Sequence, residues 1–278
     1  MTLDLQGSVP RVSTGSAVGA TLLSAVILAA IFASWLAPGD PLDMVARPLL
    51  TPLQDARFPL GTDQLGRDVL AGLLHGARVS MAVGAAAAAA AIGVGILVGT
   101  LAGFLGRFTD DFLMRITEAF QTVPTFLLAL ALVSVLGASA ANVVIAIGIS
   151  SWPATARLVR AEVLRLKRAE FVDAARLAGR VPLAIAFYEV LPGALQPVVA
   201  LIGITVGEAI LVESALAFLG LSDPNLNSWG GMIANGRALL RNAPYLVAIP
   251  GIAIATAVLA VTLVGDVLAS RFGLINRR

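Results

Sequence analysis

The sequence predicts an all-α integral membrane protein with six transmembrane helices. Of its 278 residues, 58% are hydrophobic and only 13% are charged, whereas soluble domains carry roughly 25% charged residues. The apolar residues form continuous stretches that are long enough to cross about 30 Å of hydrocarbon as helices. Short segments of alternating polarity, which are typical of the strands of a membrane barrel, are not found. We therefore expect the bilayer to be the solvent for most of the chain.

The first predicted span covers Ala17–Ala37, which is 21 residues without a charge. As a helix this stretch measures about 32 Å. A cleavable signal peptide is the alternative, but its apolar core would hold only about 7–15 residues. We therefore expect a retained first helix.

The second predicted span covers about Val79–Leu105 and carries a glycine at every fourth position, namely Gly95, Gly99 and Gly103. This spacing puts the three glycines on one helix face, where another backbone can approach closely. The approaching helix could belong to this chain or to a partner subunit. We favour packing within the chain.

The third and fourth spans are predicted from Ala119–Ala156, which is 38 residues without a charge. This stretch is too long for one span of about 20 residues and suits a hairpin of two. The small and polar residues of Gly137–Asn142 suit the turn. Pro124 is expected to kink or start the third helix, and Pro153 to lie near the end of the fourth.

The fifth and sixth spans are predicted within Leu195–Leu221 and over about Tyr245–Val264. Prolines in their first turns, Pro197 and Pro250, can be accommodated by neighbouring helices. The chain is therefore divided into two parts. Residues 1–78 form a cytoplasmic N-terminal segment, the first helix and an outer loop, and residues 79–278 form a five-helix core.

The distribution of basic residues predicts the orientation in the membrane. If the N-terminus is cytoplasmic, the inner segments hold 13 Lys and Arg residues: 1–16, 106–118, 157–194 and 265–278. The outer segments then hold 6: 38–78, 138–142 and 222–244. Because basic residues concentrate on the cytoplasmic side, both termini are expected there.

The inner segment 157–193 is the long polar stretch of this chain. Strong helix formers and apolar residues at three- and four-residue steps predict that much of it is helical. Pro182 is expected to end or start a helix. On composition alone, a solvated basic loop that only sets the topology would explain the segment.

Six residues of this segment resemble the EAA motif of the membrane subunits of ATP-binding-cassette (ABC) importers: Asp173, Ala174, Ala175, Gly179, Leu191 and Pro192. Asp173 stands where the motif usually has Glu, and Glu189 occupies a position that is usually apolar. The resemblance implies the type I ABC importer fold, in which this loop couples to an ATPase subunit. Small side chains would let a short helix lie close to that partner, and Gly179 permits a turn with positive φ.

An outer segment, residues 58–68, resembles a stretch in the C-type permeases of dipeptide and oligopeptide importers. Its candidate residues are Gly61, Thr62, Asp63, Gly66, Arg67 and Asp68. The glycines suit turns, and the charged residues could pair locally or cap the next helix. We favour a structured loop at the membrane surface over direct contact with substrate.

Two carboxylates, Glu208 and Glu213, lie in the predicted fifth span, within a segment from 207 to 230 that resembles the same peptide and nickel permease family. A carboxylate at membrane depth is costly and normally faces protein or a wet cavity. Both residues could line the pore, where they could meet the ammonium end of a peptide. Each could equally make a structural hydrogen bond between helices.

Together these resemblances imply a pore subunit of an importer that moves di- or oligopeptides across a bacterial inner membrane. The expected partners are a homologous permease subunit, two ATP-binding subunits, a periplasmic or lipid-anchored substrate-binding protein and membrane lipid, but no nucleic acid. A phosphate-binding loop, Gly-x-x-x-x-Gly-Lys-Ser/Thr, is missing from the sequence. We therefore expect ATP and magnesium on the partner subunits, and no catalytic, cofactor or metal residue in this chain.

Three alternatives stay open at this point. The first is a nickel or other small-solute permease of the same family, although the sequence offers no cluster of metal ligands. The second is a proton-coupled secondary carrier that uses Glu208 or Glu213 as a relay. The third is a membrane scaffold or sensor.

Overall fold

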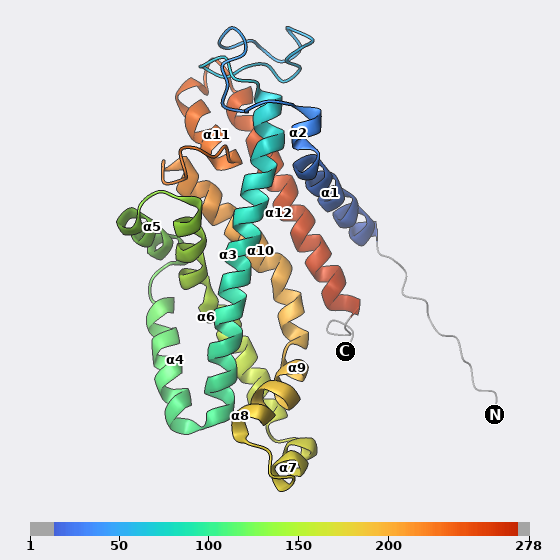
Figure 1. The fold of residues 1–278 in the computed structure, drawn as a ribbon, viewed down its shortest axis with the longest axis vertical. Helices are drawn as coiled ribbons and strands as arrows, with labels where there is room; N and C mark the ends of the chain where they lie inside the picture. Colours follow the sequence, from blue (N-terminus) through green and yellow to red (C-terminus); the bar gives the residue numbers. More distant parts are fainter. Residues whose placement is uncertain (1–13, 272–278) are drawn as a thin grey trace, which may run out of the picture.

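The computed structural model describes residues 14–271, which form a bundle of long helices with loops gathered at one end (Figure 1). The all-α prediction is confirmed for this part of the chain, whose only β-type pairing is an isolated bridge between Thr62 and Asp68. Following the predicted orientation, the end that holds residues 38–68 is called the outer end. The opposite end, which holds residues 167–184, is called the inner end.

The helices are, in chain order, α1 (Thr14–Ile31), α2 (Ala33–Leu36), α3 (Val69–Leu105), α4 (Arg107–Gln121), α5 (Thr125–Leu136), α6 (Ala140–Leu166), α7 (Glu170–Leu177), α8 (Pro182–Ala184), the π-helix η1 (Ile185–Val190), α9 (Leu191–Ala194), α10 (Gln196–Phe218), α11 (Trp229–Gly236), the 3₁₀-helix η2 (Arg237–Leu239) and α12 (Tyr245–Arg271).

Helix α3 begins ten residues before the predicted start at Val79 and runs for 37 residues, which is about 55 Å. It begins at Val69 because the Asp68 side chain accepts a hydrogen bond from the backbone N–H of Leu70 at 2.9 Å. The predicted start was too late because Arg78 ends the uncharged stretch on which the prediction rested, whereas the helix itself continues past this residue to Val69.

The glycine stripe of α3 packs against α6, as predicted. A Cβ on Gly95 would lie 2.5 Å from Cβ of Thr155, and one on Gly103 would lie 2.8 Å from Cγ1 of Val163. At Gly99 the same atom would lie 2.4 Å from the backbone oxygen of Ala156. The two backbones are therefore close enough to exclude any side chain larger than hydrogen at these positions.

The predicted hairpin over Ala119–Ala156 is only partly correct. Pro124 precedes α5, and the chain turns at residues 137–139 before α6, as predicted. However, α4 and α5 meet at an 86° bend, and α5 has 12 residues, or about 18 Å. Pro124 lacks an N–H and disfavours helical backbone at the preceding residue, so the apolar stretch is broken there.

Helix α6 continues through Pro153 to Leu166 instead of ending near the proline. Pro153 is buried in the bundle, where neighbouring helices can accommodate a missing backbone hydrogen bond. Similarly, Pro250 lies inside α12, beyond its first turn, whereas Pro197 occupies the first turn of α10 as predicted. The inner part of α6 therefore belongs to the inner segment 157–193, much of which was predicted to be helical.

The number of spans supported by helix length and composition is four, from α3, α6, α10 and α12, or five if α4 and α5 form one bent span. The first predicted span corresponds to α1 and α2, which are separated at Phe32. Among the described residues, its apolar helix is Ala17–Ile31, which is shorter than the helices that qualify as spans. The six-span topology therefore stays a prediction.

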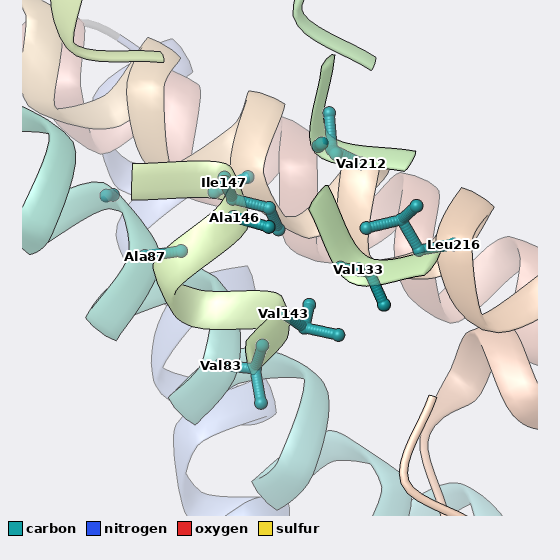
Figure 2. Close-up of a cluster of buried hydrophobic side chains, with 11 residues drawn as sticks. Val83, Ala87, Val133, Val143, Ala146, Ile147, Val212 and Leu216 are labelled. Atoms are coloured by element: carbon teal, nitrogen blue, oxygen red, sulfur yellow. The ribbon is translucent and has the colours of Figure 1, made fainter. Parts of the chain in front are cut away.

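The core consists of four clusters of buried side chains along the bundle. The cluster shown in Figure 2 joins α3, α5, α6 and α10 through Val83, Ala87, Val133, Val143, Ala146, Ile147, Val212 and Leu216. A second cluster lies toward the inner end, and two more lie toward the outer end, around Trp229 and around Leu246. Each cluster joins segments that are far apart in the sequence.

Helices α1 and α12 pack side by side, and the described chain begins and ends on the same side of the bundle (Figure 1). A Cβ on Gly19 would lie 2.5 Å from Cβ of Leu263, so the two backbones are in close contact. This arrangement is compatible with the prediction that both termini share one side of the membrane.

We predict that Gly99→Ala destabilises the bundle, because the added Cβ meets the backbone oxygen of Ala156. The expected loss is about 1–3 kcal/mol of unfolding free energy, as for overpacked cores. The matched control is Gly93→Ala on the same helix, since that position has no atom within 4 Å of an added Cβ. Thermal unfolding in detergent checks this, and equal midpoints for the two variants would contradict it.

Candidate coupling and translocation sites

The inner knob, residues 167–193, is a short helix, a turn and a second helical stretch at the inner end of the bundle. Helix α7 ends in a Schellman motif, in which the N–H of Arg180 bonds to the carbonyl of Ala175 at 3.2 Å. This turn requires positive φ at Gly179, which has φ 76° as predicted. The knob therefore reverses direction within a few residues of Leu177.

The inner knob is attached to the bundle by the inner core cluster. Val172 of α7 is completely buried, and so is Val190 at the end of the π-helix. They belong to one cluster with residues of α3, α6 and α10: Phe104, Val159, Val163 and Val198. A displacement of α7 would therefore be transmitted by packing to three long helices.

The EAA-like residues lie on both faces of the inner knob. Asp173, Ala174 and Gly179 are exposed, whereas Ala175 packs against the inner core cluster. Leu191 also packs against this cluster, and the exposed Pro192 lies in the first turn of α9. The exposed face continues in apolar side chains such as Leu177, which is 90% exposed.

Glu189, which departs from the usual pattern of the motif, pairs with Arg180. The ion pair joins the turn after α7 to the π-helix η1. It gives the carboxylate a partner where the motif usually has an apolar residue. The departure is thus compensated within the inner knob.

Two further ionic contacts at the inner end were not predicted. The Lys167 ammonium donates to the backbone oxygen of Phe104 and lies 5.2 Å from the centre of that ring. Burial lowers the pKa of Lys167. Arg160 of α6 makes two hydrogen bonds to the carboxylate of Asp110 of α4, at 2.5 and 2.6 Å. These contacts fix α3 and α4 to the inner end of α6.

The outer motif builds a loop that folds on itself. Gly61 and Gly66 have φ of 79° and 80°, and a Cβ on Gly66 would lie 2.1 Å from the backbone oxygen of Ala46. Asp63 accepts hydrogen bonds from the backbone N–H groups of Leu65 and Arg67 at 2.8 and 2.9 Å. These contacts support the structural interpretation of the motif.

Thr62 holds this loop together, and Tyr245 connects the loop to the bundle. Thr62 is completely buried and its hydroxyl donates to the backbone oxygen of Arg47 at 2.6 Å. The hydroxyl of Tyr245, at the start of α12, lies 3.0 and 2.8 Å from the backbone oxygens of Leu50 and Thr62. Arg67 lines a small hollow between the loop and α11.

Glu213 joins three helices. Its side chain is only 4% exposed and accepts hydrogen bonds from the hydroxyls of Ser80 and Ser214 at 3.4 and 3.3 Å. Ser80, on α3, in turn accepts from the backbone N–H of Trp229 in α11 at 3.2 Å. Of the two interpretations of Glu213, this geometry favours a structural hydrogen bond between helices.

Glu208 differs from Glu213 in that its side chain is exposed and lines a recess between α4, α5, α6 and α10. The recess is lined by Phe120, Gln121, Val123, Pro124, Thr125, Ser150, Ser151, Pro153, Ala154 and Glu208. It lies at the level of the bend between α4 and α5. The two carboxylates of α10 therefore face different surroundings.

The three groups of candidate residues are not brought together. The outer motif and the inner knob lie at opposite ends of the bundle, and α10 lies between them (Figure 1). Sequence reasoning missed Lys167, Asp110 and Arg160 because no local pattern links partners that are 50 or more positions apart. The only available signal for these contacts was that Lys167 is the single lysine of the chain.

Residues 95–273 match the family described as "Binding-protein-dependent transport system inner membrane component". The chain is similar to a di/tripeptide transport system permease protein, DppC, of Pseudomonas aeruginosa, with 40% identity over 91% of this chain and 85% of the relative. It is similar to a glutathione transport system permease protein, GsiD, of Salmonella paratyphi A, with 41% identity over 87% and 80%. A solved structure of the MetNI methionine ABC transporter, in inward-facing conformations, shares the fold. Its TM-score is 0.60 at 17% identity, over 72% of this chain and 96% of that chain.

We predict different effects on stability for the two carboxylates of α10. Glu213→Ala leaves two buried serine hydroxyls without an acceptor and should lower the unfolding free energy by about 1–3 kcal/mol. Glu208→Ala removes no hydrogen bond or ion pair within residues 14–271 and should not lower stability. Thermal unfolding of the purified chain measures both. A Glu208 variant that is as unstable as the Glu213 variant would refute this assignment.

Proposed function

The chain belongs to the family of binding-protein-dependent transport system inner membrane components, and from this we propose that it is the pore subunit of an importer of di- or oligopeptides. The observation that carries the substrate class is the 40% identity to a di/tripeptide permease over 91% of the chain. The similarity to a glutathione permease points to the same class, since glutathione is itself a small peptide.

We propose that the inner knob is the docking site for an ATPase subunit. Its exposed face, with Asp173, Ala174 and Gly179, is available to a partner, while Val172 anchors it to the inner core cluster. A partner that binds two positions of the knob with different affinity would shift the equilibrium between two arrangements of the long helices. Leu191 and Pro192 would contribute by holding the start of α9.

The proposed assembly includes a homologous permease subunit, two ATP-binding subunits and a periplasmic or lipid-anchored substrate-binding protein. ATP and magnesium would be bound by the ATPase subunits. We also propose six spans in a bacterial inner membrane with both termini in the cytoplasm. The close packing of α1 on α12, with both described ends on one side, supports this topology.

We predict that Ala174→Trp prevents the ATPase subunits from copurifying with this chain, because the large side chain would separate the surfaces that small residues allow to meet. Ala174 suits this test better than Ala175, since Ala175 packs against the inner core cluster. The control is Ala138→Trp, at an exposed position in the turn between α5 and α6. Normal copurification with Ala174→Trp would contradict docking at the knob.

We predict that vesicles holding the complete complex take up labelled dipeptide only when ATP is supplied to the ATPase side. A pH gradient alone should produce no uptake, because the motor is expected to be the ATPase and not the carboxylates of α10. Uptake by this chain alone under a pH gradient would instead establish a secondary carrier. Nickel uptake without peptide uptake would keep the family and change the substrate.

A further inference from the structure

The recess around Glu208 has the features of a site for a positively charged group. Glu208 lies near the middle of α10, a 23-residue apolar helix, and its side chain is exposed. Within residues 14–271 it has no hydrogen-bond or ion-pair partner. Because an isolated carboxylate is costly at membrane depth, this side chain must meet water or a cation from outside the described chain.

The other walls of the recess also present electronegative groups. Helix α4 ends at Gln121, where the negative end of the helix dipole lies. Of its last four carbonyls, Thr122 donates to those of Glu118 and Ala119, and those of Phe120 and Gln121 have no partner in the described part of the chain. On α6, Pro153 has no N–H to bond to the carbonyl of Ile149. The Ser151 hydroxyl is buried without a hydrogen-bond partner in the described part of the chain.

The charges near the recess are unbalanced. Glu208 is the one charged residue in the lining. The guanidinium in direct contact with a lining residue is that of Arg157, which donates to Oε1 of Gln121 at 2.8 Å and is engaged there. The recess thus combines one carboxylate with helix-end carbonyls and a free hydroxyl, which are the groups that solvate an ammonium ion.

We propose that this recess binds the ammonium group at the amino terminus of a peptide in transit. This inference rests on the proposed function, because it assumes that a peptide passes along this face of α10. The bend between α4 and α5 and the proline of α6 contribute to this proposal, since each leaves backbone carbonyls unbonded in a segment that lines the recess. Modest affinity suffices, because the peptide must also leave.

The first test measures the charge preference of the recess without transport. The chain contains no cysteine, so Val123→Cys, at an exposed position in the lining, gives it a single thiol. In the assembled complex, a cationic methanethiosulfonate reagent should modify this thiol faster than an anionic one, as followed by mass spectrometry of this chain. Adding Glu208→Gln should lower the cation-to-anion rate ratio by about tenfold.

The matched control for this test is Asp266→Asn, which removes an exposed carboxylate from α12 outside the recess. This substitution should leave the rate ratio unchanged. A ratio that does not depend on Glu208 would overturn the proposal, and it would indicate that a basic side chain of a partner subunit already neutralises the carboxylate.

The second test measures transport by the complete complex in vesicles. Glu208→Gln should lower the uptake of a dipeptide with a free amino group by about tenfold, while ATPase activity stimulated by the binding protein is retained. Uptake of the N-acetylated dipeptide should be low and unaffected by the substitution. An equal loss for both peptides would overturn the ammonium assignment. If the wild-type complex imports no peptide, the proposed function fails and the ammonium assignment fails with it, while the thiol test still decides whether the recess prefers cations.

Discussion

The close contact between the backbones of α3 and α6 is the constraint on which the rest of the structure depends. Along this seam Gly95, Gly99 and Gly103 leave no room for a side chain against α6. Without a hydrophobic driving force between helices in lipid, such close van der Waals packing provides much of the association energy. Because both helices extend to the inner end, this seam fixes the positions of the inner knob and of the recess around Glu208.

Much of the fold could be predicted from the sequence because lipid imposes long apolar stretches and because local rules are strong. The cap at Asp68 and the turn at Gly179 follow such rules. The prolines show a feature that local rules do not predict, namely whether a helix breaks at the proline or continues through it. Pro124 separates two helices bent by 86°, whereas Pro153 lies within one continuous helix. The same residue type gives opposite results because neighbouring helices decide whether the lost hydrogen bond is tolerated.

The residues of the candidate sites could be named from the sequence, but their arrangement in space could not. Glu208 and Glu213 were treated alike, yet five residues along a helix correspond to a rotation of about 140°, so the two side chains face different helices. The contacts of Tyr245 with Leu50 and Thr62 join positions 195 and 183 residues apart. Such pairs cannot be read from local spacing, since only the packed bundle brings them together.

The loop at the outer end also has a mechanical consequence. It leads covalently into α3 and is bound by Tyr245 to the start of α12, so it ties the outer ends of these two helices together. At the opposite rim the long helices are joined by side-chain packing and ion pairs. The two ends of the bundle are therefore held by different kinds of contact, and a separation of α3 from α12 at the outer end would have to break the hydrogen bonds of Tyr245.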